Sequence, residues 1–187
     1  TVQRSLGVRH RLADLLRSGH QSPEERAVTG NTLARLGDPR FCPEAWYLPK
    51  EDMLGLVEIP EGPFLMGSDP KRDEEVLENE FPQHKIDLPR YYIGRYPVTV
   101  GQFQAFVKDS GYKPRDEDCL QGLPNHPVVN VTWHDALAYC DWLTETLRRW
   151  EHTPEPLATF LRKEGWRITL PSEPEWEKAA RGPDGLI

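Results

Sequence analysis

Residues 167–182 have the sequence RITLPSEPEWEKAARG, and this stretch is the most informative one about the fold. Ser172 and Glu175 stand at the spacing of a capping box, in which each side chain accepts the other residue's backbone amide proton. The pair predicts a short helix that begins after Ser172 and ends at Gly182, where glycine tolerates the left-handed backbone of a helix stop.

Trp176 is the only large apolar side chain of this predicted helix. A helix this short is not stable by propensity alone, so tertiary burial must hold it. We therefore expect Trp176 to be mostly buried, against a helix that contains Trp133 and Trp142, which should also bury large areas. The charged neighbours should face solvent or form local hydrogen bonds: Glu173, Glu175, Glu177 and Lys178.

The same signature precedes three more segments with helical spacing of apolar residues. It predicts helices at residues 22–36, 99–111 and 132–147, begun by the pairs Ser22–Glu25, Thr99–Gln102 and Thr132–Asp135. Leucines at positions 12, 15 and 16 indicate another helix, which should stop at Gly19.

Between the first and the later helices the periodicity is that of strands. Residues 56–59 and 64–67 flank a turn at 60–63 and predict a hairpin, and residues 86–88 and 91–93 predict extended segments broken at Pro89. The whole is an α+β chain. We place a boundary near residue 50, with a helical lead-in and linker at 1–50 and a domain at 51–187.

Composition excludes several classes of protein. Seven Lys/Arg and four Asp/Glu give residues 1–40 a charge of +3. Because the net charge is −7, the rest of the chain carries −10. An acidic body is a poor nucleic-acid ligand. No apolar run has the roughly 20 residues of a membrane helix, and the scattered positions of Cys42, Cys119 and Cys140 favour free thiols in the cytoplasm.

The residues contain no recognisable active site. Cys140 lies on an apolar helix face and Cys119 lies among acids, so each thiol should have a raised pKa. Glu175 and Glu177 lie near a helix N-terminus, which favours their ionised form. We therefore predict no catalytic, cofactor-binding or metal-binding residue in this chain.

Histidines offer the other candidates. His84 follows residues 69–80, which carry six acids and two bases, and together they could hold a divalent ion such as a structural calcium. The acids lack EF-hand spacing, and a solvated charged face is the favoured interpretation. His126 and His134 stand alone, and we expect them to pack or to form hydrogen bonds.

Five segments, in order, resemble those of the formylglycine-generating enzyme/sulfatase-modifying factor family. They are IPEGPFLMGS at 59–68, EFPQH at 80–84, YIGRYPVT at 92–99, HPVVNVTW with DALAYCDW at 126–142, and RITLPSEPEWEKAARG at 167–182. The resemblance implies a C-type-lectin-like fold, of which this chain contains the N-terminal half. It also implies that a partner, the C-terminal half, completes the domain as a continuation or as a separate polypeptide.

In catalytic members of the family, a copper-binding cysteine pair lies in that C-terminal half. None of the three cysteines of this chain matches either cysteine of that pair, so no catalytic residue carries over. Cys140 matches a structural cysteine of the family. Residues 22–40 resemble the helical lead-in of such domains in large bacterial multidomain proteins, many of which lack the oxidase cysteines.

The resemblance leaves three functions open. The favoured one is a non-catalytic module that binds an unknown protein or small ligand through a C-terminal surface, as in retroelement-diversified variable proteins. The alternative is a formylglycine-generating or related copper oxidase whose catalytic half is absent from this chain. The third is an interaction domain without a small ligand.

Overall fold

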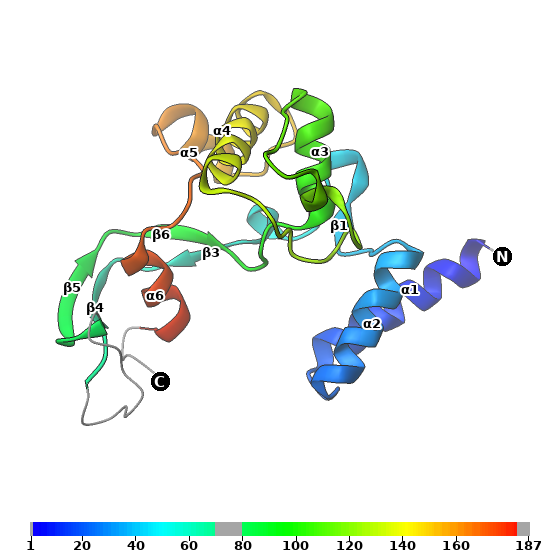
Figure 1. Ribbon diagram of the computed structural model, residues 1–187, viewed down its shortest axis with the longest axis horizontal. Helices are drawn as coiled ribbons and strands as arrows, with labels where there is room; N and C mark the ends of the chain where they lie inside the picture. Colours follow the sequence, from blue (N-terminus) through cyan, green and yellow to red (C-terminus); the bar gives the residue numbers. More distant parts are fainter. Residues whose placement is uncertain (1, 70–79, 183–187) are drawn as a thin grey trace. The chain divides into compact units, whose positions relative to one another are not determined.

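The computed structural model describes residues 2–69 and 80–182 (Figure 1). The chain divides into two compact units, one formed by Thr1–Gly55 with Tyr96–Thr169 and the other by Leu56–Arg95 with Leu170–Ile187. The boundary near residue 50 stays a prediction.

The first unit begins with the predicted helical lead-in. Helices α1 (Val2–Ser18) and α2 (Pro23–Leu36) pack as a hairpin, and the box of Ser22 and Glu25 begins α2. A small apolar core joins them, made of Leu12, Ala13, Leu16 and Leu33.

A buried ion pair follows the hairpin. The Asp38 carboxylate lies 2.6 Å from the Arg40 guanidinium and accepts a hydrogen bond from the Asn125 amide, which also donates to the Gly30 carbonyl. Burial alone raises the pKa of Asp38, but the hydrogen bonds from Arg40 and Asn125 lower it by more. These contacts attach the lead-in to the loop around residue 125.

Residues 41–55 form a folded linker. Strand β1 (Phe41–Cys42) pairs antiparallel with β2 (Leu48–Pro49), and the 3₁₀ turns η1 (Pro43–Ala45) and η2 (Asp52–Gly55) follow each strand. The ring of Tyr47 stacks on Phe41 at 4.9 Å, which packs the linker against itself.

Helices form the rest of this unit. They are α3 (Val100–Ser110), η4 (Glu117–Leu120), α4 (Trp133–Arg149) and α5 (Leu157–Lys163). Both predicted boxes, at Thr99 and Thr132, are present. The core between the helices is aromatic and aliphatic, with Phe103, Phe106, Tyr139, Leu147 and Leu161 buried.

Helix α5 was not predicted because its start has no side-chain cap. Its N-cap position is Pro156, which offers no hydrogen-bonding side chain. Burial of Leu157 and Phe160 holds the helix instead, and Arg162 donates to the carbonyls of Arg148 and Trp150.

The second unit contains an antiparallel two-stranded ribbon. Strand β3 (Leu56–Ile59) pairs with β6 (Tyr91–Gly94), and β4 (Gly62–Met66) pairs with β5 (His84–Leu88). The predicted hairpin of β3 with β4 is therefore wrong. Two residues on each side of the ribbon separate the pair Ile59↔Tyr91 from the pair Gly62↔Leu88. Both ladders therefore share one register.

Prolines explain why this ribbon is interrupted. Pro60 and Pro89 lie in the gap between the two ladders, and neither has an amide proton to donate to a ladder. The local pattern of residues 56–67 indicated two strands correctly. It did not indicate that both would pair with segments further along the chain, from Leu56↔Gly94 to Met66↔His84, and not with each other.

Helix α6 (Glu173–Arg181) docks on this ribbon through its charged residues. The buried Lys178 ammonium donates to the carbonyls of Pro60 and Gly62, each at 2.8 Å. Glu177 accepts the Gly67 amide proton at 2.8 Å and pairs with Arg181 at 2.6 Å. The expectation that Glu177 and Lys178 face solvent or bond only locally is wrong. Carbonyls at the interruption of the ribbon accept from Lys178, and the Gly67 amide, just after β4, donates to Glu177.

The burial predicted for the tryptophans is also wrong for two of the three. Trp176 is 62% exposed and Trp133 is 63% exposed, while Trp142 is half-buried. Hydrogen bonds that Lys178 donates and that Glu177 accepts replace the apolar anchor that we expected from Trp176.

Replacing Lys178 with methionine should lower the free energy of unfolding of this unit by about 2 kcal/mol. Methionine keeps the length of the side chain but removes the charged donor from two carbonyls. Chemical denaturation and hydrogen exchange of the α6 amides would measure the effect. Lys85→Met, at an exposed position of β5, is the matched control, and equal losses from both substitutions would contradict this role.

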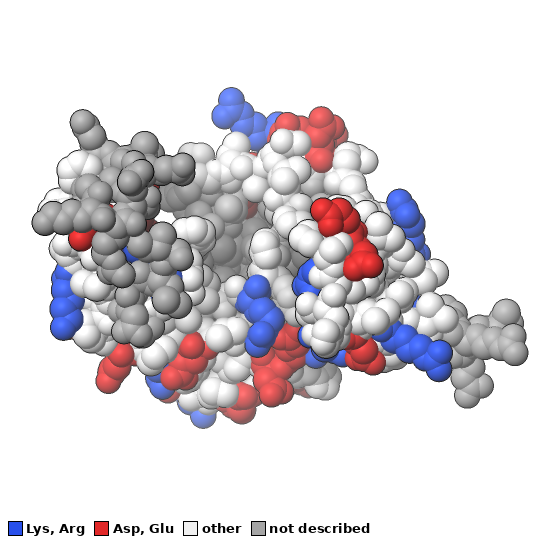
Figure 2. All heavy atoms as spheres, turned by 90° about the horizontal axis from the view of Figure 1, so that it is seen from below, with Lys and Arg blue, Asp and Glu red and all other residues white. Residues whose placement is uncertain are grey.

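Charges are mixed on the surface that Figure 2 shows. Lysines and arginines lie among aspartates and glutamates there, and neither sign forms a broad continuous patch on that face. Among the helices of residues 2–69 and 80–182, none is long and apolar enough to cross a membrane.

Candidate functional site

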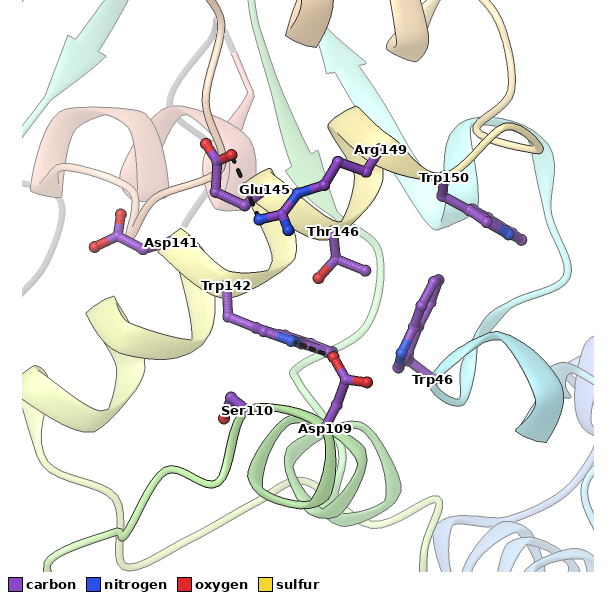
Figure 3. A pocket seen from close by; sticks show the side chains of 9 residues that line it. All are labelled: Trp46, Asp109, Ser110, Asp141, Trp142, Glu145, Thr146, Arg149 and Trp150. Atoms are coloured by element: carbon purple, nitrogen blue, oxygen red, sulfur yellow. Dashed lines mark hydrogen bonds and ion pairs between the residues drawn. The ribbon is translucent and has the colours of Figure 1, made fainter.

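An open pocket of about 600 Å³ lies in the first unit between the linker, the end of α3 and the second half of α4 (Figure 3). We call it the tryptophan pocket. Its lining residues are Trp46, Asp109, Ser110, Asp141, Trp142, Glu145, Thr146, Arg149 and Trp150.

Three indoles dominate the lining. Trp46 lies between Trp142 and Trp150, with its ring nearly perpendicular to both, at 85° and 83° (Figure 3). The ring centroids are 6.3 Å and 5.4 Å apart. These are edge-to-face arrangements, which the quadrupoles of aromatic rings favour.

A left-handed backbone places Trp46. Its φ and ψ are 51° and 32°, and φ of the following Tyr47 is 58°. Bulky residues rarely adopt this region, and each such residue costs on the order of 1–3 kcal/mol. The stack of Tyr47 on Phe41 and the bond from the Tyr47 amide to the Cys42 carbonyl at 2.8 Å hold the turn in place.

Space beside the turn is also tight. A methyl group at Gly101, in α3, would lie 2.7 Å from the Tyr47 ring. The helix backbone therefore approaches this ring as closely as only a glycine allows. Strain of this kind persists where surrounding contacts enforce it, and such positions concentrate at functional sites.

Trp142 is fixed from two sides. Its indole Nε1 donates to the Asp109 carboxylate at 2.9 Å, and its ring packs on Phe106 and Tyr139 at 5.3 Å and 5.7 Å. Its orientation therefore follows from α3 and from the core beneath it.

Trp150 caps the C-terminus of α4. Its amide donates to the Thr146 carbonyl at 2.9 Å, and its own carbonyl accepts from Arg162 at 2.6 Å. Positions 142, 146 and 150 follow at four-residue spacing and share one side of the helix end.

Carboxylates outnumber basic groups in the pocket. Asp109, Asp141 and Glu145 line it together with one guanidinium, that of Arg149, which lies 3.8 Å from Glu145. Glu145 also pairs with Arg148 at 2.6 Å. The lining thus combines aromatic faces with an acidic rim.

Sequence reasoning found this site only in part. It singled out Trp142, but as a core residue, and it did not single out Trp46 or Trp150. The spacing of Trp142, Thr146 and Trp150 was a usable signal. Trp46 gave none, because its position depends on a turn formed by tertiary contacts.

The raised pKa predicted for Cys119 and Cys140 is confirmed in direction, but Cys119 is buried, which the sequence did not predict. Burial raises the pKa of the Cys140 thiol to about 11, with a smaller effect of Asp141. Burial, and then the charges of Asp135 and Asp116, raise the pKa of Cys119. Both thiols are therefore protonated at neutral pH and are poor nucleophiles and metal ligands.

The three thiols do not form a copper site of the kind that catalytic members of the family carry in their C-terminal half. Such a site needs two thiolates that converge on one ion. Cys42, Cys119 and Cys140 are unpaired, and they belong to β1, η4 and α4. Within residues 2–69 and 80–182, no three His, Cys, Asp or Glu side chains gather as a metal site would require.

The histidines pack or form hydrogen bonds, as expected. His126 lies 2.6 Å from the Asn31 side chain, and the His134 ring packs edge-on against Trp133. His84 is exposed at the start of β5, with Nδ1 2.9 Å from the Pro82 carbonyl. Most of the acidic segment considered with it, 70–79, lies outside the described residues.

Glu175 and Glu177 have separate structural tasks. Glu175 completes the capping box with Ser172, at 2.7 Å from its amide. Glu177 binds the Gly67 amide and Arg181. The structure therefore does not bring these two carboxylates together as an acid–base pair.

Comparison with known proteins identifies the family. Residues 44–185 match the sulfatase-modifying factor enzyme 1-like domain, which is most of the chain. The chain therefore belongs to this family. The predicted fold class, α+β with the C-type-lectin-like architecture of formylglycine-generating enzymes, is confirmed at this level.

Individual relatives have different names. Formylglycine-generating enzyme of Thermomonospora curvata is 29% identical over 179 residues, covering 72% of this chain and 51% of that enzyme. Hercynine oxygenase of Mycolicibacterium thermoresistibile is 31% identical, covering 63% and 28%. Serine/threonine-protein kinase Pkn1 of Chlamydia trachomatis is 30% identical, covering 72% and 20%.

Among solved structures, PvdO from Pseudomonas aeruginosa aligns with 49% of this chain and 40% of its own, at 27% identity and a TM-score of 0.43. The chain spans about half, or less, of the length of these relatives.

Proposed function

We propose that this chain is part of a non-catalytic ligand-binding module on a formylglycine-generating-enzyme-like scaffold. The tryptophan pocket carries the proposal. Three indoles, one of them held in a strained backbone, line an open site with an acidic rim. The pocket volume of about 600 Å³ suits a small ligand or a side chain of a larger one.

Fluorine NMR of the protein labelled with 5-fluorotryptophan tests this function. The six tryptophans give six signals, assigned by single Trp→Phe substitutions. We expect some compounds of a small-molecule library to shift the signals of Trp46, Trp142 and Trp150 together, with the Trp166 signal as internal control. A library that shifts none of the three pocket signals would refute the proposal.

Besides a small ligand, we propose the rest of the family domain as a partner of this chain. The chain spans about half of the Thermomonospora enzyme, and Trp133 and Trp176 expose large apolar faces. We propose that the remaining part covers these faces and adds a ligand surface of its own, in the narrowest case a retroelement-diversified one. In the fluorine spectra, a soluble paramagnetic agent should broaden both signals in this chain and spare them in the longer protein.

A formylglycine-generating or related copper oxidase is the second candidate function. The names of the relatives favour it, since they include formylglycine-generating enzymes and hercynine oxygenases at 29–31% identity. Oxygen consumption by the longer protein with copper and a cysteine peptide would support it and would exclude the non-catalytic proposal. For both candidate functions we propose the cytoplasm as the location, and the free state of Cys42, Cys119 and Cys140 supports this.

A further inference from the structure

We propose that the tryptophan pocket binds the quaternary ammonium head group of a small molecule, of which choline is the simplest example. This inference rests on the proposed function and specifies its ligand. It follows from the angle between the indoles, from the charges around them and from the state of one indole N–H.

The angle between the Trp46 and Trp142 rings suits a compact cation. A cation is attracted to the face of an indole when it lies within about 6 Å of the ring centroid. Trp46 and Trp142 stand at 85° with centroids 6.3 Å apart, so a group in the angle between them can contact both rings (Figure 3). A flat ligand such as a sugar ring would instead stack on one face.

The charges around the indoles also favour a cation. Three carboxylates and one guanidinium line the pocket, and the guanidinium of Arg149 is already drawn to Glu145. Opposite charges close to an aromatic cage add to the attraction of a cation. Glu145 is paired with Arg148 and Arg149, so the carboxylates of Asp109 and Asp141 are the ones that would repel an anion or a zwitterion with a free carboxylate.

The hydrogen bond of Trp142 strengthens its ring for this task. Its Nε1 donates to the Asp109 carboxylate, which shifts electron density into the indole and makes its face more negative. The same bond uses up the indole donor, which a sugar hydroxyl or a carbonyl would need. The hydroxyl of Ser110 is likewise engaged, at 2.7 Å from the Phe106 carbonyl.

The ring faces favour a methylated over a primary ammonium. Indole faces offer no hydrogen-bond acceptor, so an NH₃⁺ group replaces its hydration only where it reaches the carboxylates of the rim. A trimethylammonium group has no N–H to satisfy, and its methyl groups pack on the rings. Aromatic cages of this kind recognise quaternary ammonium ligands.

The experiment compares choline with 3,3-dimethyl-1-butanol, its uncharged isostere, by calorimetry and by the fluorine signals of Trp46 and Trp142. We expect choline to bind about tenfold more tightly, because the shapes match and only the charge differs. High salt should weaken the binding of choline. Equal binding of both compounds would overturn the ammonium assignment and leave the pocket as a ligand site.

Variants connect the binding to the proposed cage. Trp46→Leu should abolish the binding of choline, Trp46→Phe should retain part of it, and Asp141→Asn should weaken it several-fold. The controls are Trp133→Phe and Glu117→Gln, which change exposed residues of the same unit that do not line the pocket. Binding that is unaffected by Trp46→Leu would place choline elsewhere and refute the inference.

Two sources of the head group can be separated. Free choline titrates the isolated chain directly, and sedimentation with phosphatidylcholine vesicles measures binding to a lipid head group. Either response supports the assignment and names the source. If neither responds while other compounds shift the three pocket signals, the ammonium assignment fails and the proposed binding function survives.

Discussion

Asp135→Ala should lower the free energy of unfolding of the first unit by roughly 3 kcal/mol or more at neutral pH. The Asp135 carboxylate is 2% exposed. It accepts from the Thr132 amide and hydroxyl at 2.8 Å and 2.6 Å, from the Tyr112 hydroxyl at 2.8 Å and from the Arg115 amide at 3.4 Å. Alanine leaves all four donors without this acceptor and removes half of the capping box of α4.

The effect should depend on pH in a defined direction. Burial alone raises the pKa of Asp135, but hydrogen bonds from Thr132, Tyr112 and Arg115 lower it by more, below its ordinary 3.8. A group with a lowered pKa in the folded state stabilises the protein above its unfolded pKa, and this stabilisation disappears as the pH falls through the folded value. The wild-type advantage over Asp135→Asn should therefore shrink below about pH 4.

Chemical denaturation between pH 3 and pH 7 measures both predictions. Asp116→Ala is the matched control, because Asp116 caps only the short η4 turn and is exposed. A loss below about 1 kcal/mol at pH 7, or a wild-type advantage that grows with acidity, would contradict the role given to Asp135.

Helix starts were the part of the fold that the sequence predicted best. All four capping boxes, begun by Ser22, Thr99, Thr132 and Ser172, are present. A capping box is local chemistry, because its two side chains and two amides lie within four residues of each other. Where that chemistry was missing, at the Pro156 start of α5, the helix escaped prediction.

Strand pairing and burial could not be predicted in the same way. The register of β3 and β4 is set by β6 and β5, which lie further along the chain, and by prolines that interrupt the ladder. Trp176 was expected inside because it is large and apolar, and Lys178 outside because it is charged. Their positions are reversed because the interrupted ribbon offers Lys178 two carbonyls.

The candidate site depends both on local helix signals and on long-range tertiary contacts. Trp142 and Trp150 follow from a predictable helix, α4, whose N-terminus is fixed by Asp135. Trp46 reaches them from a linker whose left-handed turn no sequence pattern indicated. Phe106, which packs against the Trp142 ring, is therefore the residue whose substitution best tests how the pocket is built.

Phe106→Ala is expected to have the second large effect, about 3–5 kcal/mol, which is typical for the loss of a buried phenylalanine. Phe106 is 2% exposed. Its ring lies 5.0–5.7 Å from four other aromatic rings, those of Phe103, Tyr112, Tyr139 and Trp142. Alanine leaves a cavity that these rings surround, and a dense interior fills such a cavity only in part.

The substitution should also damage the pocket, because Phe106 supports the Trp142 ring from below. The matched control is Phe64→Ala in β4, which removes an equally buried phenylalanine, 1% exposed, from the other unit. Both variants should lose stability, but only Phe106→Ala should move the Trp142 fluorine signal and weaken choline binding. Phe106→Leu keeps most of the volume and serves if the alanine variant does not fold. An unmoved Trp142 signal in both Phe106 variants would show that the Asp109 hydrogen bond alone positions the indole.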